Sequence, residues 1–345
     1  MKQLFTRKLW LAGLTLLVGY TSFLLALNHG LGPHLTAFLI NRSTPNLNNS
    51  LRVETVRTDW ALRLQLSGLR GTLTTESQTI DLGAETLILE TPLPALWFQG
   101  RMVAQLHDGW GKSDAITFYG LEVAIDATDL NQTDEATQQI GILKTKAIQL
   151  GKVALGDVEA EIWKGVDQIS LLHLQASALS GTLSGRIDMI TDPSPQLELN
   201  AQLNRIHLSD LSPIQPSVFK NARGHGDGTL KASTTEDGNV QFDLKFGVAK
   251  GGAIQAPLLE SLMQHIPAAA RTQALRQAAV GDQPVRFQTA FFQITAEQPD
   301  RWKALLLMSL PEYNVNLDLE FEIRLDDAAA IPKLLRLLQK KANDA

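Results

Sequence analysis

Histidines are the side chains of this sequence best suited to bind a metal or transfer a proton, but their spacing favours neither role. Seven of them are scattered along the chain, at positions 29, 34, 107, 173, 207, 225 and 265, without the spacing of metal ligands. His173 and His207 each stand in an apolar run, as a polar-face residue of a β-strand does. We therefore predict no metal site and no catalytic histidine.

The segment most like a ligand-binding motif is Gly224-His225-Gly226-Asp227-Gly228. Alternating glycines can form a backbone cradle for phosphate. However, the run continues through residues 229–232 (TLKA) towards a turn at Glu236-Asp237-Gly238. That context favours the start of a hairpin strand whose glycines allow close backbone approach.

Other signatures of catalysis are missing. The sequence contains no Walker loop, no G-x-S-x-G, no H-E-x-x-H and no calcium loop. It has no cysteine, which excludes a disulfide framework, a thiol nucleophile and a cysteine-based metal site. A net charge of −5 gives no attraction to nucleic acid. We predict a protein that is not an enzyme and has no cofactor; an exported enzyme with a pocket built from distant strands is a minor alternative.

The N-terminal region predicts a membrane anchor. Residues 9–27 (LWLAGLTLLVGYTSFLLAL) carry no charge, and as a helix they would span nearly 30 Å, about the thickness of a bilayer's hydrocarbon core. Lys2, Arg7 and Lys8 precede this stretch, whereas Arg42 is the first basic residue after it, so the N-terminus is expected in the cytoplasm. The anchor residues are Leu9, Trp10, Leu11, Leu14, Leu16, Leu17, Val18, Phe23, Leu24, Leu25 and Leu27.

A cleaved signal peptide is the alternative reading of this segment. Its apolar core normally runs about 7–15 residues and ends at a small-x-small site. The apolar run here is longer, and Leu-Ala-Leu-Asn-His is a poor cleavage site. We predict that residues 1–28 form the tail and an uncleaved anchor, residues 29–50 a linker, and residues 51–345 a β domain on the far side of the membrane.

Period-two alternation of apolar and polar residues dominates the rest of the chain. The longest example is residues 313–325 (YNVNLDLEFEIRL), in which every second residue is large and apolar. Such strands belong to antiparallel sheets with one wet face. The predicted apolar face consists of Leu62, Leu64, Leu66, Leu121, Val123, Ile125, Leu197, Leu199, Leu203, Val315, Leu317, Leu319, Phe321 and Ile323.

The alternating runs predict a mainly β fold of roughly fifteen strands. Turn signals include Ser67-Gly68, Leu155-Gly156-Asp157 and Ser180-Gly181. A sheet of so many strands must coil, split or close. Helical patterning is confined to residues 258–280, read as two helices broken at Pro267, and to a C-terminal helix at residues 326–341, with a short apolar turn at 92–99.

Several of these features together resemble the AsmA-like family of Gram-negative envelope proteins, which includes TamB-like members. They are the anchor, the strand-rich residues 51–71 (LRVETVRTDWALRLQLSGLRG), residues 84–96 (AETLILETPLPAL), residues 224–232 (GHGDGTLKA) and the final strands at 285–296 and 313–325. The resemblance covers most of the predicted exported part. This chain is shorter than members that bridge two membranes.

The resemblance implies a single inner-membrane anchor and a long, coiled antiparallel β-sheet that forms a periplasmic groove, apolar inside and polar outside. Membrane lipids would be the partners of such a groove, and no catalytic residue transfers from the family. The first functional hypothesis is therefore a periplasmic protein that binds or transfers phospholipid in envelope biogenesis. The second is a single-pass scaffold of an envelope assembly, similar to the N component of a type II secretion system, with protein partners and a packed apolar face.

Overall fold

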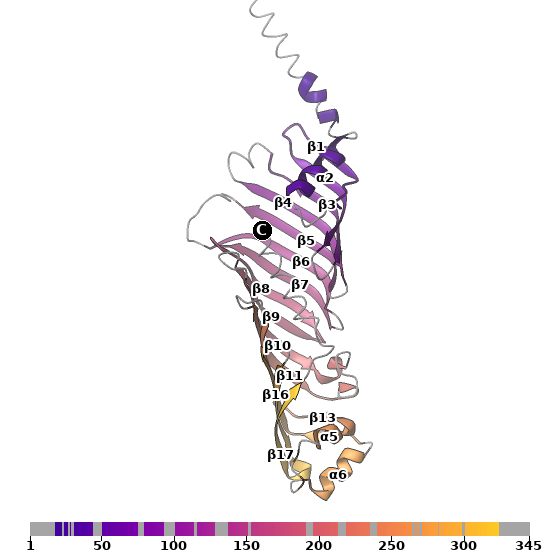
Figure 1. Cartoon of the computed structure of the whole chain (residues 1–345), viewed down its shortest axis with the longest axis vertical. Helices are drawn as coiled ribbons and strands as arrows, with labels where there is room; N and C mark the ends of the chain where they lie inside the picture. Colours follow the sequence, from indigo (N-terminus) through magenta and orange to yellow (C-terminus); the bar gives the residue numbers. More distant parts are fainter. Residues whose placement is uncertain are drawn as a thin grey trace, which may run out of the picture. The chain divides into compact units, whose positions relative to one another are not determined.

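The computed structural model of the chain places most of the sequence after residue 49 (Figure 1). The residues that it describes are 18–22, 24–26, 28, 31–43, 50–74, 79–92, 101–113, 116–127, 137–150, 153–190, 196–212, 219–234, 240–263, 266, 268, 271–281, 283–298 and 301–323. Of the predicted anchor, only Val18, Leu24, Leu25 and some of their neighbours belong to this set. The predicted C-terminal helix at 326–341 and most of the predicted turn at 92–99 lie outside it.

The fold is mainly β, as the alternation predicted. Fifteen strands form one antiparallel sheet in the order β1-β2-β3-β4-β5-β6-β7-β8-β9-β10-β11-β12-β15-β16-β17, and β13 and β14 form a separate pair. The strands are β1 Thr55–Thr58, β2 Leu64–Thr74, β3 Thr79–Leu89, β4 Met102–Lys112, β5 Ile116–Ala127, β6 Gln138–Leu150, β7 Val153–Lys164, β8 Gln168–Ala178, β9 Gly181–Ile190, β10 Gln196–His207, β11 His225–Thr234, β12 Val240–Val248, β13 Gly252–Ile254, β14 Val285–Phe287, β15 Thr289–Gln298, β16 Arg301–Leu310 and β17 Val315–Ile323.

Helices are few and short. They are α2 Gly32–Ser43, α5 Ala256–Met263 and α6 Gln273–Val280, with 3-10 turns η3 Leu208–Leu211 and η5 Pro311–Tyr313. The two helices expected at 258–280 are confirmed as α5 and α6, and Thr272 caps α6 by accepting a hydrogen bond from the Leu275 backbone. Helix α2 was not expected, because it lies in the segment read as a linker. Within the described part of the chain, no helix has the length and apolar character needed to cross a membrane.

Two of the expected turns are absent because a strand runs through them. Ser180-Gly181 does form a turn between β8 and β9, but Ser67-Gly68 lies inside β2 and Leu155-Gly156-Asp157 inside β7. Gly68 has φ 65° and Asp157 has φ 47°, and the pairing of β7 with β8 shifts register just after Gly156. A β-bulge absorbs the extra residue there, so the strand continues past the turn signal.

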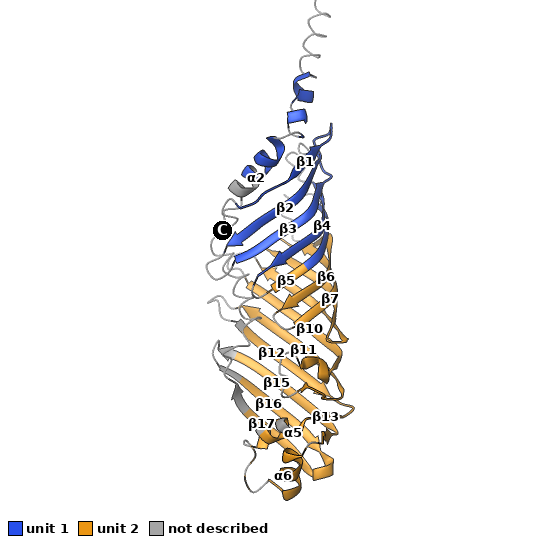
Figure 2. Cartoon of the chain, turned by 90° about the vertical axis from the view of Figure 1, so that its right-hand side faces the viewer, with its two compact units in different colours: residues 1–113, 119–133 blue, residues 114–118, 134–345 orange. Residues whose placement is uncertain are grey.

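The chain divides into two compact units, shown in two colours in Figure 2. Unit 1 comprises Met1–Ser113 and Tyr119–Thr133, and unit 2 comprises Asp114–Phe118 and Asp134–Ala345. In unit 1, Val53, Val56 and Leu66 form a small buried cluster, against which Ala37 of α2 packs.

Unit 2 contains a larger core at the strands β12, β15, β16 and β17. Helices α5 and α6 pack on one face of these strands, and Leu259 and Leu275 are both 0% exposed there. The buried strand residues of this core include Leu306, Met308 and Leu317. This part of the sheet therefore has a second layer that covers its apolar face.

Candidate functional site

By backbone position, strand register aligns one residue from each of ten neighbouring strands of unit 2 into one row, and most of these residues are apolar. Each member is the direct partner of the next across the sheet, which places all of them on one face. From β6 to β17 the row is Gly141, Ile162, Leu171, Ile187, Leu199, Ala232, Phe242, Ala296, Trp302 and Ile323. Nine strand spacings of about 4.8 Å give this row a length of about 43 Å.

A second apolar row lies on the same face, two residues along each strand except on β8, where a register shift between Leu171 and Leu174 makes the step three residues. Its register runs from Leu174 on β8 through to Phe321 on β17. The members are Leu174, Gly185, Ala201, Leu230, Leu244, Ile294, Ala304 and Phe321. We call the surface formed by the two rows the apolar face of unit 2.

The apolar face is covered at one end only, as far as the described residues show. Two further clusters on it draw every member from strands of the sheet: one is centred on Val158 and Leu174, the other on Leu197 and Ala232. Ile187, Leu199 and Phe242 pack against the second cluster and stay half-buried. From β6 to about β12 these side chains are therefore shielded by their neighbours in the sheet, and neither cluster includes a helix.

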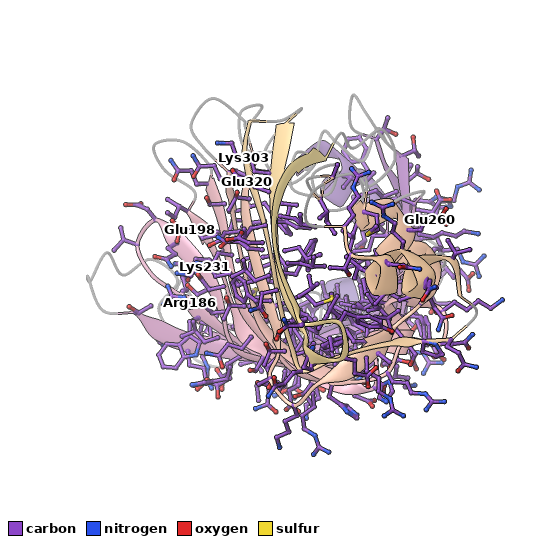
Figure 3. All side chains as sticks on the ribbon, turned by 90° about the horizontal axis from the view of Figure 1, so that it is seen from below. Arg186, Glu198, Lys231, Glu260, Lys303 and Glu320 are labelled. Atoms are coloured by element: carbon purple, nitrogen blue, oxygen red, sulfur yellow. The ribbon has the colours of Figure 1, made fainter. Side chains whose placement is uncertain are left out.

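The polar residues of the same strands project from the other side. Figure 3 shows Arg186, Glu198 and Lys231 pointing away from the side on which α5 lies, where the helix carries Glu260. The register agrees, because Asn200 pairs with Arg186 on one side and with Lys231 on the other. The predicted separation into an apolar and a polar face is thus present in unit 2.

The predicted apolar residues fall into three groups in the structure. Leu197, Leu199 and Leu203 lie on β10, and the cluster that contains Leu197 and Leu199 draws its described members from strands of the sheet. On β17, Leu317 and Leu319 are buried in the core beneath α5 and α6, and Val315 is half-buried against it. Phe321 and Ile323 are in β17 by their backbone, but their side chains lie outside the described residues.

The third group lies in unit 1. Leu64 and Leu66 on β2 join the cluster that contains Val56, and Leu121, Val123 and Ile125 are half-buried on β5. Leu62 does not belong to a strand: it sits before β2 with φ 59°, next to the turn at Asp59. The alternation of Leu62 with Leu64 and Leu66 was therefore misleading at its first residue.

A buried carboxylate is the most constrained group on the polar face. Asp188 is 2% exposed and accepts hydrogen bonds from Ser170 Oγ at 2.7 Å, Gln168 Nε2 at 2.8 Å and Arg186 Nε at 2.6 Å. Burial raises the pKa of Asp188, but the hydrogen bonds and the Arg186 charge outweigh it, so the pKa lies below its ordinary value. The same hydrogen bond raises the pKa of Arg186. The group ties β8 to β9 and leaves Asp188 no exposed oxygen for substrate chemistry.

The histidines on strands take part in local contacts rather than in a metal site. His173 Nδ1 lies 3.1 Å from Glu161 Oε2, and a hydrogen bond from Trp163 Nε1 lowers the pKa of Glu161, with His173 adding to the effect. His207 and His225 stack edge to face with ring centroids 4.3 Å apart. No group of three metal-ligating side chains occurs among the residues that the structure describes.

The Gly224-His225-Gly226-Asp227-Gly228 segment begins β11, as the hairpin interpretation predicted. A Cβ at Gly226 would lie 2.3 Å from the Phe246 ring, and one at Gly228 would lie 2.6 Å from the Lys245 carbonyl. The glycines therefore make room for β12, and the segment forms strand rather than a phosphate cradle.

Two open depressions lie along the strands β8 to β15. One, of about 440 Å³, is lined by residues such as Asn200, Lys231 and Asp243; the other, of about 550 Å³, by residues such as His173 and Arg186. Residues of the apolar rows line both depressions as well, Leu199, Ala232, Phe242 and Ala296 in the first and Leu174, Ala201 and Leu230 in the second, so each lining is mixed.

Of the residues that form the two rows, only Leu199, Phe321 and Ile323 were predicted from the sequence. Ile187, Phe242 and Ile294 come from runs that also alternate, and they were left out because one strand by itself does not reveal its partners. No family model, curated protein or solved structure matches this chain.

Proposed function

We propose that this protein is held in a bacterial inner membrane by the helix predicted at residues 9–27 and binds lipid acyl chains on the apolar face of unit 2 in the periplasm. The observation that carries the proposal is the apolar row from Gly141 to Ala296, in whose β6–β12 part the clusters of described residues contain no helix.

The physical reason is the cost of leaving such a surface in water. Apolar area in contact with water is unfavourable by roughly 25 cal/mol per Å², and an acyl chain removes it at about 0.8 kcal/mol per methylene group. The β6–β12 part of the first row covers six strand spacings, or about 29 Å, and is longer than one leaflet of a bilayer, whose hydrocarbon core is about 30 Å across in total. The apolar face therefore has room for at least one full acyl chain.

The likeness of the sequence to AsmA-like proteins supports the same function, since lipid is thought to travel along a groove in that family. No catalytic group is needed, because binding depends on apolar surface alone. The polar face, with its pairs such as Arg186 and Asp188, would meet the aqueous periplasm.

A scaffold function is the second candidate, and the core at β16 and β17 favours it. There, Leu310, Leu317 and Leu319 are fully packed by α5 and α6, as expected of a two-layer domain that binds protein partners. The two functions make different demands on the β6–β12 part of the apolar face. A scaffold needs that part covered by protein, and a lipid binder needs it free for acyl chains.

The test is to extract the full chain from membranes in a mild detergent and measure co-purified lipid by native mass spectrometry. Lipid binding predicts phospholipid adducts that survive detergent exchange at a defined stoichiometry. The scaffold function predicts lipid-free protein that crosslinks in cells to one protein through residues near Leu199. Lipid-free protein with such a crosslink contradicts the lipid proposal.

A further inference from the structure

Large apolar side chains are exposed at the N-terminal end of unit 1. Leu31 is 65% exposed, Phe38 57% and Trp60 64%, and Leu35 is also exposed. Single exposed apolar residues are normal on a protein surface, but several from neighbouring elements indicate an interaction site. We call Leu31, Leu35, Phe38 and Trp60 the N-terminal apolar residues.

Helix α2 contacts the core of unit 1 through Ala37. Ala37 packs against the cluster of Val53, Val56 and Leu66. Successive helical residues are 100° apart, so Leu35 and Phe38, three residues apart, share a face that is turned well away from Ala37. The contact of Ala37 with the cluster therefore goes with an orientation of α2 that exposes Leu35 and Phe38.

Hydrogen bonds connect the predicted anchor to the start of the sheet. The Tyr20 hydroxyl donates to the Trp60 carbonyl at 2.5 Å, and the two rings lie 6.0 Å apart. Asn28 bonds the backbone of Thr58 in both directions, donating to its carbonyl at 3.1 Å and accepting from its N–H at 2.6 Å.

These contacts set the depth of the β1–β2 turn relative to the predicted anchor. Tyr20 precedes the end of the 9–27 segment by seven residues, or about 10 Å along a helix. The Trp60 carbonyl satisfies the Tyr20 hydroxyl, as a polar group near hydrocarbon requires. Helix α2 starts four residues after Asn28, so its first residue lies within about 14 Å of Asn28.

We propose that the N-terminal apolar residues lie in the interfacial layer of the same bilayer that the anchor crosses, on the side away from the N-terminus. Trp60 then occupies the position of an interfacial aromatic residue, and α2 lies in the membrane surface with Leu35 and Phe38 towards the acyl chains. The inference rests on the anchor in the proposed function and adds a second membrane contact. It also brings the first strands of the sheet to the leaflet from which an acyl chain would come.

The absence of cysteine from the chain makes a direct test available. Nitroxide labels are attached to the single variants Leu35→Cys and Phe38→Cys of the full chain in phospholipid nanodiscs. Collision rates with oxygen, which concentrates in lipid, and with a water-soluble nickel chelate then report the depth of each label. Glu85→Cys, at an exposed position on β3, is the control in water, and Val18→Cys reports the anchor.

The proposal expects an oxygen-to-nickel ratio several-fold higher at positions 35 and 38 than at position 85. A high ratio at position 18 with water-like ratios at 35 and 38 would overturn it while leaving the anchor intact. Water-like ratios at all positions would overturn the anchor as well. Spin–spin broadening at 35 and 38 that rises with the number of chains per disc would show a second copy instead of lipid, and would also overturn it. Lipid binding by the apolar face is measured separately, by mass spectrometry.

Discussion

A single charge on the apolar face distinguishes the lipid proposal from its alternative. Leu199 lies near the middle of the first apolar row, between Ile187 and Ala232, and is half-buried. Leu199→Glu places a carboxylate at this position. The matched control is Asn200→Glu, one residue along the same strand, which places the same charge on the polar face between Arg186 and Lys231.

The expected loss of affinity follows from the spacing of the strands. An extended acyl chain crosses one spacing of about 4.8 Å with about four methylene groups. If the carboxylate keeps that stretch hydrated, roughly 3 kcal/mol of burial is lost at about 0.8 kcal/mol per methylene group. Since 1.4 kcal/mol is a factor of ten, the affinity for lipid falls about 200-fold.

The two variants are expected to differ less in unfolding free energy than in the free energy of lipid binding. Leu199 is half-buried, so losing its apolar contacts costs about 1–2 kcal/mol of unfolding free energy. Asn200→Glu is expected to be neutral or slightly stabilising, because opposite charges across neighbouring strands attract. Both proteins should therefore fold, and their circular dichroism spectra check this.

The assay is lipid content after purification, followed by titration of delipidated protein with a fluorescent fatty acyl probe. Leu199→Glu should lose the bound lipid and bind the probe about 200-fold more weakly, and Asn200→Glu should match the unchanged protein. Equal lipid content in all three proteins would refute the assignment of the apolar face as the binding surface.

Two further predictions concern the core and the buried carboxylate. Leu275→Ala removes a fully buried side chain from α6 and should lower the free energy of unfolding by about 3 kcal/mol in chemical denaturation, because a cavity remains. Asp188→Asn should lower it by about 1–2 kcal/mol at neutral pH, since Arg186 is half exposed and can return to water. Because the pKa of Asp188 is lowered on folding, its contribution is present above its ordinary value of 3.8 and is lost as the pH falls through the folded-state value.

Each of these has its own control. Val280→Ala, at a position on the same helix that is 81% exposed, should leave the unfolding free energy unchanged. A loss as large as that of Leu275→Ala would mean that α6 is stabilised by something other than its buried side. For Asp188, the difference between the unchanged protein and Asp188→Asn should shrink as the pH falls below 3.8. A constant difference would show that the charge makes no contribution.

Much of the strand content was accessible from the sequence, because alternation with period two is a local property of a strand. Residues 313–325 alternate almost without interruption, and β17 occupies Val315–Ile323. Bulges were less accessible. Leu155-Gly156-Asp157 has the composition of a turn, and only the pairing of β7 with β8 shows that the strand passes through it.

Leu199 and Leu319 show that alternation in the sequence does not predict which apolar residues a helix covers. Both are leucines in alternating runs, and both were placed on the apolar face. Leu319 is packed beneath α5 and α6, which come from a segment about fifty residues earlier in the chain, whereas the described residues that pack with Leu199 all lie on strands. Coverage by a distant helix leaves no trace in the alternation itself.

By itself, the sequence determined that the chain is mainly β, that each strand has an apolar and a polar face, and that an uncharged segment of membrane length precedes them. Only the tertiary structure decided which apolar residues align into rows, which part of the apolar face α5 and α6 cover, and that α2 turns Leu35 and Phe38 outwards. The reason is that face alternation depends on neighbouring residues. Register, coverage and the orientation of a helix depend on contacts between residues far apart in the chain.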